Sequence, residues 1–385
     1  MADKKIKILF LDHTPFIGGA QLSLIEHLKK INTDIFYPIV VCSKNAENIG
    51  LTEIYKKNNI KYYYISFGQL KIYNPIAIFR LFKSVRELNG LINNENPDLI
   101  FSNTIRANII GSLSAFFKNK KIIWFIQDYT FPKILFKLFY FIPKKIYFVS
   151  ESVAAYYNVK LNKKNVVLYI WRDMVEAIKK VSIDDIENNR KSLGNGNKLL
   201  IGYIGRLVDW KGPQVLIKAA EIFFKKQLFN FQILIIGDGK GQKESNEADL
   251  KEYVLKNNIN NVSFLGFKNN IPLFMKSLDI FCLTSVEPEP YSSVVVEAMM
   301  AKVPVIGTNL GGTPEIVRPG ETGLLVEPNN PEDLVNAILK LATDKKLAEN
   351  ISENAYNYVV ANNTAEIKTR FLEKEYLNIS GDKNI

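Results

Sequence analysis

The sequence predicts an α/β protein built from two doubly wound domains, each a parallel sheet with helices on both faces. Short apolar segments typical of buried strands alternate with amphipathic segments typical of helices, and this alternation occurs twice along the 385 residues. A polar stretch at 172–197 separates the two series, and it ends in the turn-forming run Gly194-Asn195-Gly196-Asn197. The length also suits two domains of ordinary size.

The first series predicts a domain over residues 1–172, and the second predicts a domain over 173–365. Residues 366–385 hold a helix and tail that can pack back on the first domain. Ligands of doubly wound sheets bind outside the carboxyl ends of the strands, so two such domains predict a cleft between them. The predicted strands are 6–11, 36–42, 61–65, 98–101, 122–126, 146–149 and 166–168, then 199–204, 231–236, 262–265, 280–283, 303–307 and 324–326; the helices include 20–31, 75–92, 105–117 and 365–377.

Composition favours a cytoplasmic protein. Apolar residues make up 47% and charged residues 23% of the chain, which is the balance of a soluble protein with full cores. No stretch reaches the ~18 uncharged apolar residues that would span a bilayer, and the start of the chain lacks the pattern of a signal peptide. Cys42 and Cys282 each fall in an apolar strand segment, which predicts buried free thiols and no disulfide framework.

Positive charge is concentrated in the first half of the chain. The net charge is +11; residues 1–172 hold 25 Lys and Arg against 11 Asp and Glu, and the remainder holds 25 against 28. This difference predicts an anionic partner for the first half, with a solvated basic surface as the alternative. Lysines and aromatic residues interleave there, which is typical of a helix on an anionic bilayer and also of a helix packing its aromatics on a sheet. The lysines are Lys118, Lys120, Lys121, Lys133, Lys137, Lys144 and Lys145, and the aromatic residues are Phe131, Phe136, Phe139, Tyr140 and Phe141.

Two glycine pairs follow predicted strands. The first lies in the run Gly18-Gly19-Ala20-Gln21 at the start of a helix, where backbone can come close to a ligand and helix N–H groups favour an anion. The second, Gly311-Gly312, follows the strand at 303–307. Each pair alone is equally compatible with a plain tight turn.

Two cations flank the loop after the strand at 199–204. Arg206 follows Gly205 at the carboxyl end of that strand, and Lys211 stands at the start of the next helix. An Arg fork and a Lys point charge on the ligand-facing rim of the sheet suit a diphosphate. Two surface cations around a loop are the alternative.

Two carboxylates eight positions apart, Glu289 and Glu297, form the strongest motif. A helical span would separate them by about 12 Å along its axis, more than the roughly 5–9.5 Å of a glycosidase acid pair. They are therefore better suited to hold two parts of one elongated ligand. Between them the backbone N–H groups of Tyr291, Ser292 and Ser293 stand at a helix start, where a phosphate binds well. A helix with one capping Glu and one solvated Glu fits the spacing equally.

Metal and dinucleotide motifs are missing from the sequence. There is no Asp-x-Asp, no Cys/His metal spacing and no Gly-x-Gly-x-x-Gly after the first strand. Of the two histidines, His27 has the position of a structural residue on the first helix. His13, just past the first strand, has a position that fits either the cleft or the loop surface.

Taken together, these motifs resemble family 4 of the retaining glycosyltransferases over most of the chain. The resemblance is sharpest at 199–330, where the motifs stand in family order. It implies the GT-B fold, in which two Rossmann-like domains face each other across a deep cleft, the first binding the acceptor and the second binding a nucleotide sugar. The ordered motifs are the run 205–212, Ile236-Gly237-Asp238-Gly239, Phe264-Leu265-Gly266-Phe267, the two-Glu motif and the run 303–315.

The resemblance also implies roles for individual residues. Arg206 and Lys211 would hold the donor diphosphate and stabilise its leaving charge, and Glu289 would bind hydroxyls of the donor sugar; these three are the predicted catalytic residues. Gln127 and Asp128 would lie on the acceptor side, together with His13. The predicted donor-binding residues are Gly18, Gly19, Gly205, Tyr291, Ser292, Ser293, Glu297 (on the ribose) and Phe267 (beside the base).

The chain departs from the family pattern in three places. Gln127-Asp128 stands where the family often has His-Asp, which bears on the acceptor-side catalytic contact. Tyr169-Ile170-Trp171 replaces an Asn-Gly pair, and Tyr291-Ser292 replaces Phe-Gly inside the two-Glu motif. We interpret the last two as changes in specificity or packing.

The sequence therefore predicts a retaining, metal-independent hexosyltransferase. It would move a sugar from a UDP- or GDP-sugar to a glycan or lipid-diphosphate-linked acceptor, as in bacterial cell-surface polysaccharide assembly. No cofactor beyond the donor substrate is predicted, and no nucleic-acid partner, since the basic residues come without a recognised module. Peripheral binding to the inner face of the cell membrane through the basic N-terminal domain fits this function. The alternative is a non-catalytic glycosyltransferase-like partner subunit, for which Gln127 is the main support.

Overall fold

The computed structural model describes residues 5–14, 17–44, 50–68, 75–194, 198–226, 230–239 and 245–381. Of the turn-forming run predicted at 194–197, residues 195–197 lie outside the described residues. The chain forms two compact units. Unit 1 comprises Met1–Arg172 together with Thr364–Ile385, and unit 2 comprises Asp173–Asn363.

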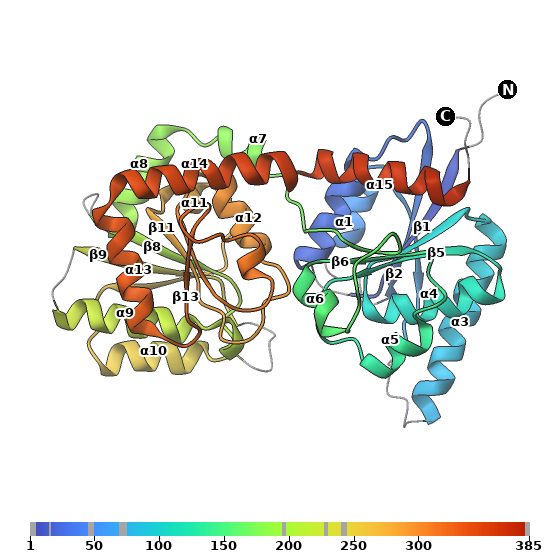
Figure 1. Ribbon diagram of the computed structural model, residues 1–385, viewed down its shortest axis with the longest axis horizontal. Helices are drawn as coiled ribbons and strands as arrows, with labels where there is room; N and C mark the ends of the chain where they lie inside the picture. Colours follow the sequence, from blue (N-terminus) through green and yellow to red (C-terminus); the bar gives the residue numbers. More distant parts are fainter. Residues whose placement is uncertain are drawn as a thin grey trace. The chain divides into compact units, whose positions relative to one another are not determined.

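Unit 1 is built on a seven-stranded parallel sheet with the order β3-β2-β1-β4-β5-β6-β7 (Figure 1). Its strands are β1 (Ile6–Asp12), β2 (Phe36–Ser43), β3 (Lys61–Ile65), β4 (Leu99–Ser102), β5 (Lys121–Ile126), β6 (Lys145–Phe148) and β7 (Asn165–Val167). Its helices are α1 (Gly19–Lys30), α2 (Leu51–Lys57), α3 (Pro75–Glu95), α4 (Ile105–Phe117), α5 (Lys133–Phe139), α6 (Glu151–Tyr156) and α15 (Ala365–Ser380).

Helices cover both faces of this sheet. Right-handed crossovers place α1 and α2 on one face and α3, α4, α5 and α6 on the other. α3 packs against α4, and α15 packs against α1. Trp124 of β5 joins two helices of the second face, because its Nε1 donates to Ser112 Oγ of α4 at 2.9 Å and its ring contacts Phe136 of α5.

His27 fastens α15 to α1. Its Nδ1 lies 2.9 Å from Thr369 Oγ1 and its Nε2 lies 3.0 Å from Tyr376 OH, both on α15. The ring is buried, and burial lowers the pKa of His27 to about 3. A neutral imidazole with both nitrogens bonded is a structural element of the core, not a ligand-binding one.

Unit 2 is built on a six-stranded parallel sheet with the order β10-β9-β8-β11-β12-β13 (Figure 1). Apolar side chains of its strands pack with α9 and α13 into one core. Its strands are β8 (Leu199–Ile204), β9 (Phe231–Ile236), β10 (Val262–Gly266), β11 (Ile280–Leu283), β12 (Val305–Thr308) and β13 (Leu324–Val326). Its helices are α7 (Val175–Lys179), α8 (Ile183–Gly194), α9 (Pro213–Lys226), α10 (Glu247–Lys256), α11 (Ile271–Ser277), α12 (Ser293–Met300), α13 (Pro331–Thr343) and α14 (Lys345–Asn362), with short 3₁₀ turns at Asp209–Lys211 and Thr313–Glu315.

The two parallel sheets confirm the predicted fold class of two Rossmann-like α/β domains. The helix at 105–117 and the strand at 280–283 match the prediction residue for residue. The strand predicted at 303–307 begins two residues later, at Val305, because Pro304 has no N–H to donate to the sheet. Cys42 and Cys282 are buried free thiols, as predicted.

Each sheet contains one point at which the direction of winding reverses. These switch points lie between β1 and β4 in unit 1 and between β8 and β11 in unit 2. Ligands of such folds bind at the carboxyl ends of the strands that flank a switch point. The residues that follow these four strands are therefore the first place to look for a site.

Candidate active site

Two loops meet at the switch point of unit 2. The loop after β8 carries Arg206 and Lys211, and the loop after β11 carries Glu289. Their backbones are joined, since the N–H of Val286 donates to the carbonyl of Trp210 at 2.9 Å. The two predicted cations and the first predicted carboxylate therefore share one edge of one sheet.

Glycine makes this close approach possible. Gly212 has φ +69°, and a Cβ at this position would lie 1.8 Å from the carbonyl oxygen of Thr284. Thr284 Oγ1 in turn donates to the carbonyl of Gly212 at 2.8 Å. A side chain at position 212 would push the loops apart and displace the neighbouring Lys211.

Lys211 and Glu289 form an ion pair between the two loops. Lys211 Nζ donates to Glu289 Oε2, and Ser285 Oγ donates to the same oxygen at 3.2 Å. The two side chains are 15% and 8% exposed, so each charge would be costly without the other. Sequence spacing identified both residues but not that they pair.

The Gly311-Gly312 pair supports the loop of Glu289. The N–H of Gly312 donates to the carbonyl of Glu289 at 2.7 Å. Gly311 has φ +64°, and a Cβ there would lie 2.4 Å from the same carbonyl oxygen. The close approach that this pair permits is to the protein backbone at Glu289, and an approach to a ligand stays a prediction.

Arg206 is exposed beside the ion pair. Its guanidinium carbon lies 5.4 Å from the centroid of a Trp210 ring, and Lys211 Nζ lies 4.3 Å from a Trp210 ring centroid. Burial raises the pKa of the nearby Tyr203 phenol, the Glu289 carboxylate raises it further, and Arg206 lowers it. The three residues predicted as catalytic therefore lie together.

The helix α12 starts next to this group, at Ser293, with Ser292 as its N-cap. The Ser292 side chain makes no cap hydrogen bond to this helix, and first-turn N–H groups are donors that can bind an anion. Tyr291, predicted to belong to the helix start, precedes it; its ring is 4% exposed and its OH accepts a hydrogen bond from Asn363 Nδ2 at 3.2 Å. Glu297 lies within α12 and is 7% exposed.

Three glycine backbones adjoin at the carboxyl ends of β8, β9 and β10. A Cβ on Gly237 would lie 1.9 Å from the carbonyl oxygen of Gly205, and the N–H of Gly237 donates to the carbonyl of Gly266 at 2.9 Å. Phe267 directly follows Gly266 and is 69% exposed. It lies two strands away from Arg206, because β9 separates β10 from β8.

A network of amides around one carboxylate occupies the switch point of unit 1. Asp12 ends β1, Asn103 follows β4 and Gln127 follows β5. Asn103 Nδ2 donates to Asp12 Oδ2 at 2.8 Å, and Gln127 Nε2 donates to Asn103 Oδ1 at 2.7 Å. Gln21 Nε2 donates to Asp12 Oδ2 at 3.0 Å, and Gln21 Oε1 accepts from the N–H of Gly18 at 3.1 Å. The network connects the first glycine run with Gln127.

The carboxylate at the centre of this network is fully enclosed. Burial raises the pKa of Asp12, whereas hydrogen bonds from Asn103, Thr14 and Gln21 lower it. The backbone N–H of Thr14 donates to Asp12 Oδ1 at 2.8 Å. The amides of Asn103 and Gln21 and the backbone and side chain of Thr14 thus hydrogen-bond to this carboxylate as donors, which suits the ionised form.

The other two acceptor-side candidates, His13 and Asp128, make separate contacts. His13 Nδ1 lies 2.6 Å from Thr104 Oγ1; burial lowers the pKa of His13 to about 4, and the charge of Arg106 lowers it too. Asp128 Oδ1 accepts from the N–H and the Oγ1 of Thr130, both at 2.8 Å, and burial raises the pKa of Asp128. His13 is thus a neutral imidazole, and Asp128 closes a turn.

Sequence reasoning missed Asp12 and Asn103, and it gave Gln21 no role. The signal was present, since a polar residue at the carboxyl end of a buried strand stands where ligands bind. Gly18 precedes α1 as its N-cap and Gly19 is the first residue of that helix. Their approach to a donor stays a prediction.

Comparison with known proteins gives the family of this site. The family model described as glycosyl transferases group 1 matches residues 184–358. An uncharacterized glycosyltransferase of Methanocaldococcus jannaschii is 30% identical over 358 residues, which cover 89% of this chain and 90% of the relative. The capsular polysaccharide biosynthesis glycosyltransferase CapM of Staphylococcus aureus is 27% identical over 374 residues, which cover 90% of this chain and 97% of CapM. The crystal structure of HepE from Anabaena in complex with UDP-glucose has a TM-score of 0.82 at 23% identity, covering 97% of this chain and 100% of HepE. This last likeness shows a shared GT-B fold.

Proposed function

Because this chain belongs to the glycosyl transferases group 1 family, we propose that it transfers a hexose from a UDP- or GDP-sugar to a glycan or lipid-diphosphate-linked acceptor, with retention of anomeric configuration. The observation that carries the proposal is the group at the switch point of unit 2. There Lys211 is paired with Glu289, Arg206 lies beside them, and the start of α12 adjoins. Cations next to the backbone N–H groups of a helix start are what a diphosphate requires.

Binding of the donor would let Lys211 exchange one anionic partner, Glu289, for another, the diphosphate. A diphosphate arriving at Lys211 offers that cation a new anionic partner, which releases Glu289 to accept hydrogen bonds from hydroxyls of the sugar. Arg206, being exposed, closes on the diphosphate as a fork. Glu297 would hold the ribose, and the exposed ring of Phe267 would stack on the base.

Transfer then needs charge stabilisation more than an enzyme base. The bond from the anomeric carbon to the diphosphate oxygen breaks, and a bond from that carbon to the acceptor oxygen forms on the same face. The hydroxyl proton passes to an oxygen of the departing diphosphate. Arg206 and Lys211 offset the charge that develops there, which we propose makes a metal ion unnecessary.

Binding of the donor is tested by thermal shift with UDP, GDP and their glucose and N-acetylglucosamine derivatives. A nucleotide that binds only the folded state at 100 times its Kd stabilises it by about 2.7 kcal/mol, which raises the melting temperature. Release of UDP or GDP from the stabilising nucleotide sugar then separates an enzyme from a non-catalytic partner subunit. Absence of both stabilisation and release would refute the proposed function.

Similarity to CapM, a capsular polysaccharide glycosyltransferase, supports a role in cell-surface polysaccharide assembly. We propose that the growing polysaccharide is carried on a lipid diphosphate, and we therefore include an anionic bilayer among the proposed partners. Among the described residues, no helix is long and apolar enough to cross a membrane. Contact with a bilayer would therefore depend on the surface of unit 1.

That surface carries exposed apolar side chains on two helices of one face of the sheet. Phe79 and Phe82 of α3 are 70% and 67% exposed, and Ile134 and Leu138 of α5 are 73% and 60% exposed. Clusters of large exposed apolar side chains mark interaction sites on soluble folds. Both helices follow the carboxyl ends of their strands, the same edge of the sheet that bears Gln127.

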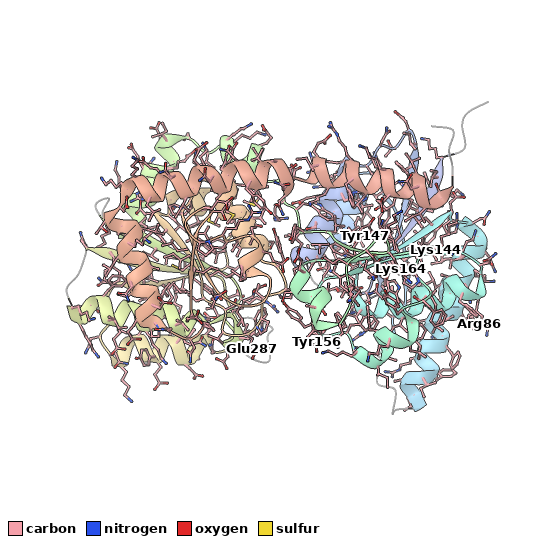
Figure 2. The ribbon with its side chains drawn as sticks, viewed as in Figure 1. Arg86, Lys144, Tyr147, Tyr156, Lys164 and Glu287 are labelled. Carbon is pink, nitrogen blue, oxygen red and sulfur yellow. The ribbon has the colours of Figure 1, made fainter. Side chains whose placement is uncertain are left out.

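Positive charge accompanies these side chains. Residues 75–86 of α3 include Arg80, Lys83 and Arg86, and α5 includes Lys133 and Lys137; neither segment contains an acid. Figure 2 shows Arg86 at the margin of unit 1. Aromatic side chains among cations suit the interface of an anionic bilayer. We therefore propose this bilayer as the occupant of the surface formed by α3 and α5.

The sequence left two interpretations open for the interleaved lysines and aromatic residues, and the structure decides between them for some of these residues. Phe131 and Phe136 are 1% and 2% exposed and pack on Trp124, so they belong to the core. Lys145 is paired with Glu375 at 2.5 Å. The alternative interpretation, a helix packing its aromatics on the sheet, is correct for these residues, and the exposed phenylalanines of α3 had no part in the prediction.

Co-sedimentation with vesicles tests the bilayer proposal. The chain should pellet with phosphatidylcholine–phosphatidylglycerol vesicles and much less with phosphatidylcholine alone, and added salt should weaken binding. The double variant Phe79→Ser/Phe82→Ser should lose most binding, whereas Phe224→Ser, on α9 of unit 2 and 42% exposed, should retain it. Equal binding by both variants would contradict the assignment.

A further inference from the structure

The loop after β8 carries an aromatic ring beside both of its cations. Trp210 is the middle residue of the 3₁₀ turn Asp209–Lys211, and its side chain is half-buried. Lys211 Nζ lies 4.3 Å from a ring centroid of Trp210, and the guanidinium carbon of Arg206 lies 5.4 Å from one. Both distances fall within the roughly 6 Å over which a ring face attracts a cation, and indole is the strongest aromatic side chain in this respect.

Backbone hydrogen bonds from both loops of the switch point hold Trp210. Its carbonyl accepts from the N–H of Val286 at 2.9 Å and from the N–H of Glu287 at 3.4 Å, both in the loop after β11. The N–H of Lys211 donates to the carbonyl of Val208 at 3.1 Å and closes the turn. The main chain that bears the ring is therefore fixed, whereas the two cations reach it by long, flexible side chains.

The acid next to Trp210 in the chain is engaged elsewhere. Asp209 Oδ1 accepts from Asn246 Nδ2 at 2.6 Å, and Asn246 is the N-cap of α10. A further carboxylate beside the cations would repel an arriving diphosphate. An indole ring attracts the same cations and adds no net charge of its own.

Ordering a flexible side chain at the moment of binding costs free energy. Arg206 is exposed, so a ring face that limits the orientations of its guanidinium lowers the part of this cost that falls on donor binding. Lys211 already donates to Glu289. Contact with a ring face uses none of the three N–H donors of an ammonium group. Lys211 can therefore keep the ring while its N–H groups turn from the carboxylate to a diphosphate.

We propose that Trp210 is a positioning residue, whose indole ring holds Arg206 and Lys211 ready for the donor diphosphate before the donor binds. This rests on the proposed function and extends it to how the free protein is prepared for an anion. Once the diphosphate is bound, its own charge holds both cations. The ring therefore contributes to donor affinity more than to the rate of the chemical step.

Fluorinated tryptophans at this one position test the proposal. Each added fluorine withdraws electron density from the ring face and changes the size of the ring little. We expect 5-fluoro-, 5,7-difluoro- and 5,6,7-trifluorotryptophan in place of Trp210 to raise the Kd for UDP in steps, up to about 10-fold. GDP replaces UDP if GDP is the nucleotide that stabilises the protein. Isothermal titration calorimetry measures the Kd, and inorganic pyrophosphate should give the same order.

Steady-state kinetics separate positioning from folding. Trp210→Leu should raise the donor KM by about 10-fold while kcat stays within about threefold of the parent value. Trp210→Phe keeps a weaker ring and should fall between Trp210→Leu and the parent protein. A variant that merely loosened the fold would lower the melting temperature and, through loss of active protein, the apparent kcat, but it would leave the donor KM unchanged.

Tyr356 provides a matched control in unit 2. Lys302 Nζ lies 4.6 Å from the centroid of the Tyr356 ring and 2.5 Å from Glu353 Oε2, so a lysine, a carboxylate and a ring meet there too. Lys302 follows the carboxyl end of α12, whereas the candidate site adjoins the start of that helix. Tyr356→Leu should therefore leave the Kd for UDP unchanged.

The outcomes distinguish this inference from the proposed function. A Kd that does not change with the number of fluorines, or a parent-like donor KM in Trp210→Leu, would overturn the inference alone. An equal loss of UDP binding in Tyr356→Leu would overturn it as well, because the effect would then not belong to the switch point. If the parent protein neither binds UDP or GDP nor releases either from a nucleotide sugar, the proposed function and this inference fall together.

Discussion

The two switch points of this molecule have one topology and opposite chemistry. In unit 2 the flanking loops bring together the charges of Arg206, Lys211 and Glu289. In unit 1 the corresponding edge holds the amides of Asn103 and Gln127 and two further partners around one enclosed carboxylate. The fold thus decides where a site can form, and the few residues after each strand decide which charged or polar groups stand there.

The loops are also held by different means. In unit 2 backbone meets backbone, and glycines with positive φ at 212 and 311 allow that contact. In unit 1 side chains bridge the loops, and the members are pinned by hydrogen-bond direction. The site in unit 2 therefore depends on glycine and on charge compensation, whereas the site in unit 1 depends on side-chain amides that donate to Asp12 and to one another.

The largest expected effect is on turnover at the charged switch point. Arg206→Ala/Lys211→Ala removes both cations that we propose offset the charge of the leaving diphosphate, and we expect kcat/KM to fall by about 10³-fold or more, on the scale of losing preorganised electrostatic stabilisation. Release of UDP or GDP measures it. Lys225→Ala removes an exposed lysine of α9 that pairs with Glu221 and should leave the rate unchanged. Full activity in the double variant would rule out the roles assigned to these cations.

The second-largest expected effect is on the free energy of unfolding. It tests whether the buried charges of Lys211 and Glu289 are each destabilising without the other. Lys211→Met leaves a carboxylate that is 8% exposed without its cation, and we expect a loss of about 3 kcal/mol. Lys211→Met/Glu289→Gln removes both charges and should recover most of that loss. Calorimetric melting of the three proteins measures it. If the double variant is as unstable as the single one, burial of the charge is not the cause.

The sequence could predict features formed by residues that are close together in the chain, but not contacts between residues that are far apart in it. Strand and helix positions come from local periodicity, and Arg206, Lys211 and Glu289 come from motifs within a few residues of a strand end. Their pairing joins positions 78 apart, and the bond between Asp12 and Asn103 joins positions 91 apart. Such contacts depend on strand order in the sheet, which no local pattern contains.

The local sequence pattern also could not predict which apolar side chains of a helix are buried. Phe136 and Leu138 stand two residues apart on α5, yet one is 2% and the other 60% exposed. Helix periodicity predicts that a short helix has two faces, but the face that meets Trp124 is set by the sheet beneath it.

The third effect separates backbone clash from backbone strain at the glycines that hold the unit 2 loops. Gly212→Ala would place a Cβ 1.8 Å from the carbonyl oxygen of Thr284, whereas Gly320→Ala has φ +74° with nothing within 4 Å. The control should cost about 1–2 kcal/mol for the left-handed conformation alone. Gly212→Ala should cost roughly 1–2 kcal/mol more and also slow turnover through Lys211. Equal melting temperatures would show that the loops can separate freely.

The smallest expected effect is a dependence of stability on pH between pH 5 and pH 7. It concerns unit 1, because both histidines of the chain lie there. The folded pKa of His27 is lowered to about 3 from an ordinary 6.5, so the unfolded chain binds this proton more readily. Its stability contribution is complete above pH 6.5 and is lost as pH falls below it, at about 1.4 kcal/mol per pH unit. His27→Gln removes this dependence. The gap in melting temperature between His27→Gln and the parent protein should therefore narrow steadily from pH 7 to pH 5. A gap that stays constant over this range would mean that His27 has the same pKa in the folded and unfolded states, which would contradict a ring held neutral by burial.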